Sequence, residues 1–379
     1  MTAVHQLLAT AESGDPLADA VVTELDLYGA RARRVLDAGL RNGLAGLDER
    51  PPEAMGALLT QLEAIPDRVD PLVLHRGDVV SLSVPPLWFQ LCSIPCALAH
   101  SYASPTVAHL TADAGVSAVT ATLRLAEAGV WARQALRPGG LLRGTPGYMA
   151  TVRIRLFRAR ARTTARAYCT ELSNPVPAVT QADMARTWLG FTLISFRALA
   201  AVGIDISPEE ESNLYQYWSY LAHLLGIDET LHQDVTDHTD ARRLQDLLDT
   251  TTAEPDETSR AMTNAMVDAQ ARALAGAPGS GMSEEQVRAL IHRILREALG
   301  TEGADRLGIP VPAMTDLMPL VSRLNRQARY WQTYSPASAG EARRRAVEGP
   351  GPELIAALLT SPAAQRPSAT AHHEDTLAA

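Results

Sequence analysis

The sequence predicts an all-α protein built as a single globular, multi-helix domain. Alanine and leucine dominate the composition, whereas aromatic residues make up only 5% of it, and this balance favours packed helices over sheets. Apolar residues recur at helical spacing through most of the chain, and several stretches carry the Ser or Thr that starts a helix. We find no convincing strand pattern. With 379 residues, the chain is long enough to bury a large core.

The first part of the chain, residues 1–78, is predicted to form helices that pack on the core. Residues 4–47 have a helical pattern that breaks near Gly14, and a second helix follows Pro51 and ends near Leu62. The least polar segment, residues 79–100, comes next. Because it contains three prolines, we expect it to form a buried helix pair that is kinked at those prolines.

The remaining helices are predicted from their start and stop signals. A helix over residues 118–135 precedes a glycine-rich loop at 138–147. Thr180 is expected to cap a central helix that runs to about Val202, and Ser207 caps the next one, which stops at Gly226. Further helices are predicted over 244–274, from Ser283, and over 314–334. We assign 79–335 to the helical core and 336–379 to a flexible C-terminal extension, disordered at least from residue 361.

The segment with the most uneven charge is residues 151–166, a predicted helix that carries six arginines. At about 100° per residue, Arg155, Arg158 and Arg162 fall on one stripe, while Ile154 and Phe157 lie on another face. Two kinds of partner fit this stripe. Residues 205–257 hold fourteen acids against two arginines and can neutralise it; alternatively, part of the stripe binds an anionic ligand.

Residue content disfavours several functional classes. The chain contains no lysine, which excludes a Schiff-base, phosphate-loop or general-base lysine. The formal net charge of −9 argues against nucleic-acid binding. Cys92, Cys96 and Cys169 are too few for a disulfide framework and favour buried thiols, and we predict no metal site. We find no export signal and no membrane span, and we therefore expect a cytoplasmic protein.

Several short motifs follow one another in a recognisable order. They are Tyr102-Ala-Ser-Pro105, Arg124-Leu-Ala-Glu127, Pro138-Gly-Gly, Arg155-Leu-Phe-Arg-Ala-Arg-Ala-Arg162, Gln181-Ala-Asp-Met-Ala-Arg-Thr187 and Trp218-x4-His-Leu-Leu-Gly226. In this order they resemble the latex-clearing protein family, also described as the rubber-oxygenase or MpaB-type oxygenase domain, over about residues 97–310. The resemblance implies an all-α fold with a globin-like helical core. It also implies haem b as the cofactor and cleavage of isoprenoid double bonds with dioxygen.

The sequence departs from that family on the arginine helix. The family pattern there is Arg-Leu-x-His-Ala-x-x-Arg, whose His supplies the proximal imidazole to iron, and Arg158 stands at that position. A guanidinium stays protonated near neutral pH and has no lone pair for a metal. Arg124 keeps the family arginine near the distal face, but Ala128 replaces the expected threonine. If haem is bound, His100 or His223 has to supply a shifted axial ligand.

Three functional hypotheses follow. The first is an enzyme of specialised metabolism that binds an apolar small molecule, with an anionic oxygen, in a repurposed haem-type pocket. The second is a haem b oxygenase with the shifted ligand, and the third is a non-catalytic binding or scaffold protein. For the first, the candidate catalytic residues are Arg158, Arg124, Tyr102, His100 and Asp183. The candidate substrate-binding residues are Arg155, Arg162, Phe157, Thr187, Phe191 and Trp188. The sequence does not indicate an oligomeric state.

Overall fold

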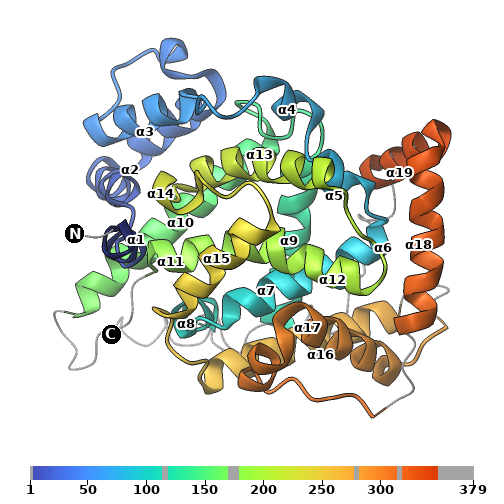
Figure 1. Ribbon diagram of the computed structural model, residues 1–379. Coiled ribbons are helices and arrows are strands. Elements are labelled where there is room, and N and C mark those ends of the chain that lie inside the picture. The colour runs from blue at the N-terminus through green and yellow to red at the C-terminus, as the bar shows by residue number, and fades with distance from the viewer. Residues whose placement is uncertain (1–2, 113–117, 170–178, 277–280, 314–317, 349–379) are drawn as a thin grey trace.

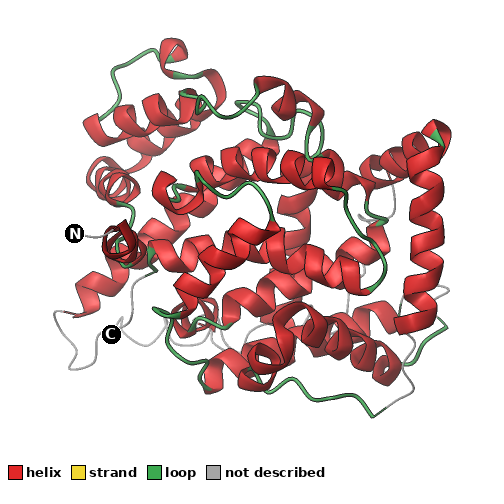
Figure 2. Cartoon of the chain, viewed as in Figure 1, coloured by secondary structure: helices red, strands yellow, loops and turns green. Residues whose placement is uncertain are grey.

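Helix α10, Pro146–Cys169, packs against α2, α9 and α13. The computed structural model describes residues 3–112, 118–169, 179–276, 281–313 and 318–348 (Figure 1). Throughout these residues the regular structure is helical and no strand occurs (Figure 2). This confirms the predicted fold class. The predicted disordered stretch from residue 361 lies outside the described residues.

The helices have the following bounds. The first half contains α1 Ala3–Ala11, α2 Pro16–Asn42, η1 Leu44–Gly46, α3 Glu53–Glu63, α4 Pro71–Arg76, α5 Val79–Ser83, α6 Pro86–Trp88, η2 Phe89–Ser93, α7 Ile94–Tyr102, α8 Pro105–Ala112, α9 Ala118–Leu136 and α10. The second half contains α11 Gln181–Leu189, η3 Gly190–Ile194, α12 Ser195–Ala201, α13 Pro208–Leu225, α14 Glu229–His232, α15 His238–Asp249, α16 Glu257–Ala275, α17 Glu284–Arg306, α18 Met318–Tyr334 and α19 Pro336–Glu348. Helices α2 and α3 lie at one edge, α18 and α19 at the opposite edge, and α9, α11, α12 and α13 lie between them (Figure 1).

The predicted helix caps are present at the expected residues. The side chain of Thr180 accepts a hydrogen bond from the backbone N–H of Asp183, and the Asp183 carboxylate accepts one from the backbone N–H of Thr180. Ser207 and Ser283 form the same reciprocal capping arrangement at the starts of α13 and α17. Each cap satisfies backbone N–H groups that the first turn of a helix leaves without partners.

The central apolar helix is interrupted by a π-helical segment. Residues 181–201 continue without a break, but η3 widens the helix between α11 and α12. Gly190 opens this segment, and a Cβ atom added there would lie 3.0 Å from the Cα atom of Ala97 on α7. The absence of a side chain at Gly190 therefore lets two buried helices approach closely, and π-helical segments of this kind often border functional sites.

The proline-rich segment forms the kinked pair that the sequence predicts. The helices between Pro71 and Ser83 and those between Pro86 and Tyr102 are bent by 85° relative to each other. Only this bent pair has the length and apolar content of a possible membrane span, and no single helix among those described has both. Leu91, Cys92, Ile94 and Cys96 are buried, so this segment contributes to the core of the protein.

The arginine helix is neutralised by acids that the sequence analysis did not select. Arg155 pairs with Asp15, with 2.6 Å between Nε and Oδ2, and Arg162 pairs with Asp19, with 2.8 Å between Nε and Oδ1. Both acids belong to the start of α2, and further along that helix Asp26 and Asp37 pair with Arg160 and Arg153. For these four arginines, the alternative in which residues 205–257 neutralise the stripe does not hold. Because α2 packs along α10, its carboxylates reach these arginines first.

Candidate functional site

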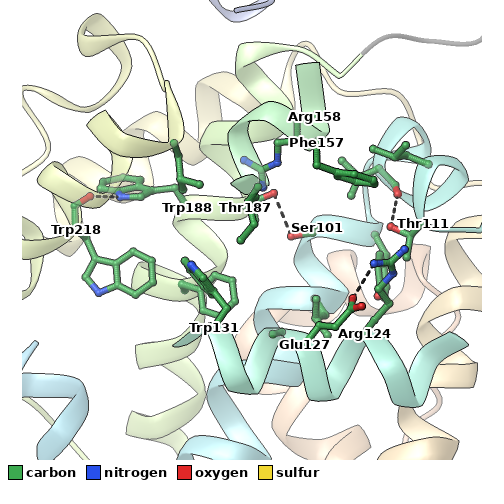
Figure 3. A pocket seen from close by; sticks show the side chains of 18 residues that line it. Ser101, Thr111, Arg124, Glu127, Trp131, Phe157, Arg158, Thr187, Trp188 and Trp218 are labelled. Carbon is green, nitrogen blue, oxygen red and sulfur yellow. Dashed lines mark hydrogen bonds and ion pairs between the residues drawn. The ribbon is translucent and has the colours of Figure 1, made fainter. Parts of the chain in front are cut away.

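A cavity of about 240 Å³ lies between α7, α8, α9, α10, α11 and α13. Its volume is close to the lower end of the range of about 300–1,000 Å³ that small-molecule sites occupy. Most of the wall is apolar. The residues that line it are Leu98, Ser101, Tyr102, Val107, Leu110, Thr111, Arg124, Glu127, Ala128, Trp131, Ile154, Phe157, Arg158, Thr187, Trp188, Phe191, Trp218 and Leu225 (Figure 3).

One end of the cavity is built from indole rings. Trp131 lies edge-on to Trp218 with 6.2 Å between ring centroids, and Phe191 stacks on Trp218 at 5.6 Å. The N–H group of each indole is already used: Trp131 donates to Thr151 Oγ1, Trp188 to the carbonyl oxygen of residue 218, and Trp218 to Asp78 Oδ2. The three rings therefore offer carbon surface to a ligand and no free donor.

Arg158 brings a positive charge to this apolar space. Its side chain is half-buried, and its Nη1 atom is fully buried without a hydrogen-bond partner in the described part of the chain. Burial lowers the pKa of Arg158 from its usual 12.5 to about 10, because the guanidinium loses water; the nearby charge of Asp183 opposes this change and that of Arg162 adds to it. At neutral pH the group is therefore charged and lacks a hydrogen-bonded counter-ion among these residues.

A charged pair of side chains, Arg124 and Glu127, lies at the other end of the cavity, away from Trp188 and Trp218 (Figure 3). Arg124 Nη1 donates to Glu127 Oε2 at 2.7 Å, and both side chains are partly exposed. Tyr102 is buried beside them and makes no hydrogen bond with the described residues. Burial raises the pKa of the Tyr102 phenol well above its usual 10, so this hydroxyl keeps its proton and can donate it to a ligand.

Two hydroxyl groups on the wall can offer a ligand acceptor oxygens, because their protons are used within the protein. Ser101 Oγ donates to the carbonyl oxygen of Ala97 at 2.9 Å, and Thr187 Oγ1 donates to the carbonyl oxygen of Asp183 at 3.0 Å. The two oxygens lie 3.4 Å apart. Since each hydroxyl proton has a backbone acceptor, a ligand meets mainly their lone pairs.

Seven of the residues selected from the sequence meet at this cavity. They are Arg158, Arg124, Tyr102, Phe157, Thr187, Phe191 and Trp188. Arg155 and Arg162 do not, although the helical stripe groups them with Arg158. Arg158 is displaced by about 40–60° around the helix from the other two, which is enough to turn it from α2 towards the cavity. Arg155 and Arg162 are buried in ion pairs and are not available to a substrate.

The structure also places Asp183, His100 and His223 away from the cavity lining. The Asp183 carboxylate caps α11 and accepts a further hydrogen bond from the hydroxyl group of Ser104, so both of its oxygens are hydrogen-bonded. His223 lies on the far side of α13, where its Nε2 atom is 3.0 Å from the carbonyl oxygen of Gln61. These three residues lie in or beside the family motifs in the sequence, but they do not line the cavity.

His100 lines a different cavity, of about 300 Å³, between α7, α11 and α17. Its Nδ1 atom is 3.0 Å from the carbonyl oxygen of Arg186, and since a carbonyl only accepts, Nδ1 carries the proton. Burial lowers the pKa of His100 well below its usual value, so the ring is neutral. This cavity also contains Arg186, which pairs with Asp249.

Glu127, Trp131 and Trp218 complete the cavity but were not selected as site residues. Glu127 and Trp131 follow Arg124 on α9 at spacings of three and seven, so all three fall on one helix face. That spacing was the signal that could have identified them. Trp218 appeared only as part of a motif, because the sequence alone does not show which side of α13 faces inward.

The residues of this cavity do not fit a haem iron. An axial ligand needs a lone pair on nitrogen, sulfur or oxygen at bonding distance, and the inward residue at the family ligand position is a protonated guanidinium. No histidine lines this cavity, and the two proposed substitutes hydrogen-bond elsewhere. Within the described ranges, no three His, Cys, Asp or Glu side chains are grouped to hold any metal ion.

Comparison with known proteins places the chain among helical oxygenase domains. The family described as "ER-bound oxygenase mpaB/B'/Rubber oxygenase, catalytic domain" matches residues 88–331. A solved structure described as "Structure of Latex Clearing Protein LCP in the closed state" is 17% identical in sequence, with a TM-score of 0.58. The alignment covers 91% of this chain and 89% of that one, which shows a shared fold. No curated protein sequence matches this one.

Proposed function

The chain belongs to the mpaB and rubber oxygenase catalytic-domain family, and from this premise we propose that it is an enzyme that uses the family's helical scaffold on an apolar small molecule. In this proposal Arg158 holds an anionic oxygen of that molecule, at the position where relatives carry a haem-ligating histidine. The matched residues 88–331 contain every residue that lines the cavity, so the proposed site lies wholly inside the family domain.

One observation carries the proposal: Arg158 lines an apolar cavity, and its guanidinium has a nitrogen without a hydrogen-bond partner among the described residues. Nη1 of Arg158 is fully buried, and no described side chain or carbonyl accepts a hydrogen bond from it. Leaving a buried donor without a hydrogen-bond partner costs roughly 1–3 kcal/mol of stability, and a charged donor costs more. Elsewhere on α10, the buried arginines Arg155 and Arg162 are paired with aspartates. A carboxylate or enolate oxygen bound at Arg158 would satisfy this donor.

The other residues that line the cavity favour an apolar body for the proposed substrate. Trp131, Trp188 and Trp218 present carbon surface without a free N–H group, which suits a hydrocarbon or aromatic portion. Arg158 would repel a cationic ligand. We therefore propose a substrate with an apolar body and one anionic or strongly polarised oxygen, a combination common among specialised metabolites.

Tryptophan fluorescence tests this proposal directly, because three of the five tryptophans line the cavity. We expect octanoate to bind the wild-type protein at least tenfold more tightly than octan-1-ol, which has the same chain length without the charge. Arg158→Met should remove that preference. Arg153→Met, which changes an exposed arginine of the same helix, is the matched control and should retain it. Equal affinities for the two probes in the wild-type protein would contradict the proposal.

An absorbance spectrum and metal analysis test the haem alternative. The protein would be expressed with added haem precursor and purified without denaturation. We expect no Soret band and no stoichiometric iron, since the cavity lining offers no histidine or cysteine as an axial ligand. A Soret band that disappears in His100→Ala or His223→Ala would instead establish a haem protein with a shifted ligand.

A further inference from the structure

Proton transfer in this cavity needs a base, and the described cavity lining contains a single carboxylate. Asp183 was a candidate, but its oxygens serve the cap of α11 and the hydroxyl group of Ser104. His100 belongs to the second cavity, and the chain has no lysine. Glu127 is the acidic residue that lines the main cavity, from helix α9.

The surroundings of Glu127 allow it to exchange protons with both ligand and solvent. Its Oε2 atom accepts a hydrogen bond from Arg124, whereas Oε1 has no hydrogen-bond partner among the described residues. The side chain is 62% exposed, so water reaches it. Pairs spaced three residues apart on a helix surface often contribute little to stability. Here, however, both members also line the cavity, and Arg124 orients the carboxylate.

Glu127 and Arg158 extend from different helices into the same space. Glu127 comes from α9 and Arg158 from α10, and they lie on opposite sides of the cavity (Figure 3). Enolate formation here requires a molecule between them with its oxygen at the guanidinium and an adjacent carbon near the carboxylate. A cation at the oxygen and a base at the neighbouring carbon are the two groups that enolate formation requires.

We propose that Glu127 is the general base of this site and that the substrate is an apolar carbonyl compound with an acidic C–H group beside the carbonyl. The inference rests on the function proposed above. The Glu127 carboxylate takes the proton, the C–H electron pair forms a carbon–carbon double bond, and the carbonyl π electrons move to oxygen. Arg158 holds the resulting enolate. The proton then returns to the same or another carbon, so the net change is exchange or isomerisation without an oxidant.

Tyr102 has a supporting part in this scheme. Its phenol keeps its proton, has no hydrogen bond to the described residues, and lies near enough to Arg124 and Glu127 to feel both of their charges. It can therefore donate a hydrogen bond to the carboxylate or to the ligand oxygen, which makes it a positioning residue. The rings of Trp131, Trp188 and Trp218 would hold the apolar portion of the substrate away from water.

Hydrogen–deuterium exchange of a defined probe tests the proposal. The probe is 2-oxo-4-phenylbutanoate, which has an aromatic end, an anionic end and acidic hydrogens at C3. It would be incubated with the full-length protein in D₂O, and deuterium at C3 followed by NMR and mass spectrometry. Binding of the same probe would be measured in parallel by tryptophan fluorescence.

We expect Glu127→Gln to lower the protein-catalysed exchange rate by at least about 100-fold, the usual contribution of a positioned general base. Its affinity for the probe should stay within about threefold of wild type, because Gln keeps the shape of the side chain. Glu127→Asp should recover part of the exchange rate. Glu341→Gln removes the acid of another helix pair spaced three residues apart, with Arg344 on α19, and should leave exchange unchanged.

The outcomes separate the two proposals. Probe binding that depends on Arg158, with no exchange in the wild-type protein, would overturn the role of Glu127 and leave the proposed function standing. The same holds if exchange occurs and Glu127→Gln does not reduce it. Absence of probe binding, or binding that Arg158→Met does not change, would count against the proposed function itself.

Discussion

Two faces of α10 carry the same residue type in opposite surroundings. On the face towards α2, Arg155 and Arg162 are almost fully buried and each is paired with an aspartate. On the face towards the cavity, Arg158 is buried at Nη1 and pairs with no described residue. The difference shows that the role of a buried arginine depends on what the neighbouring helix presents to it. A carboxylate makes it structural, and under the proposed function an apolar cavity makes it available to a ligand.

The largest expected effect comes from removing an ion pair on the face of α10 towards α2, called the paired face below. Arg155→Met leaves Asp15 buried without its counter-charge, and such a loss costs about 3–5 kcal/mol of unfolding free energy. Urea denaturation followed by circular dichroism measures it. The double variant Asp15→Asn, Arg155→Met should recover part of that loss, because no unpaired charge remains. A loss below about 1 kcal/mol in the single variant would mean that the ion pair is not important for stability.

Acidification tests a third arginine environment, in which Arg68 faces an imidazole. Arg68 Nη2 lies 3.3 Å from His232 Nδ1. Burial, with a smaller contribution from the charge of Arg68, lowers the pKa of His232 from 6.5 to about 3. The unfolded chain therefore binds a proton that the folded one does not, so stability is complete above pH 6.5 and falls as the pH drops towards 3. The slope from this residue is at most about 1.4 kcal/mol per pH unit.

Urea denaturation at pH 7, 6 and 5 measures this slope. His232→Gln should make the unfolding free energy less dependent on pH within that window, because Gln has no proton to gain. If the variant keeps the full wild-type dependence of unfolding free energy on pH, the acid sensitivity comes from groups other than His232. The imidazole beside Arg68 would then not differ from the aspartates of the paired face in its effect on stability.

A smaller effect on stability is expected from Arg158. Arg158→Met should leave the unfolding free energy unchanged or raise it by about 1 kcal/mol, because no hydrogen-bonded pair is lost and a desolvated charge is removed. Differential scanning calorimetry in the absence of ligand measures this. Marked destabilisation would show that Arg158 has a structural partner, and would weaken the contrast between the two faces.

The smallest effect is expected from the exposed end of the paired face. Arg153 contacts Asp37 at 3.1 Å, but its side chain is 58% exposed, and solvent-exposed pairs contribute about 0–1 kcal/mol. Arg153→Met should therefore shift the thermal midpoint by no more than a few degrees. A larger shift would mean that the presence of an aspartate partner, rather than the burial of the pair, controls the stability of the contact between α2 and α10.

Much of the fold could be predicted from the sequence because its signals are local. Thr180, Ser207 and Ser283 begin helices where their side chains satisfy backbone N–H groups, and this needs no knowledge of distant residues. The π-helical segment η3 could not be predicted in this way. It is associated with the close approach of Gly190 to Ala97, a contact between residues far apart in the sequence.

The site could be predicted only in part, for the same physical reason. The family pattern identified Arg158 because it occupies a defined position, whereas the choice between Asp15 and the acids of residues 205–257 depended on which helix lies beside α10. Likewise, Glu127 was visible only as part of a motif. Its exposure to the cavity follows from the rotation of α9 about its axis, which tertiary packing sets.

The pairing of Asp15 with Arg155 also has a consequence for the way the chain folds. The two residues are 140 positions apart in sequence, so Asp15 leaves the ribosome roughly 7–28 s before Arg155, at about 5–20 residues per second. During that interval Asp15 lacks the arginine with which it pairs in the folded protein. The contact between α2 and α10 can form only after most of the intervening helices have been synthesised, and contacts of such long range slow folding. The N-terminal helices should therefore be among the first parts made and the last to dock.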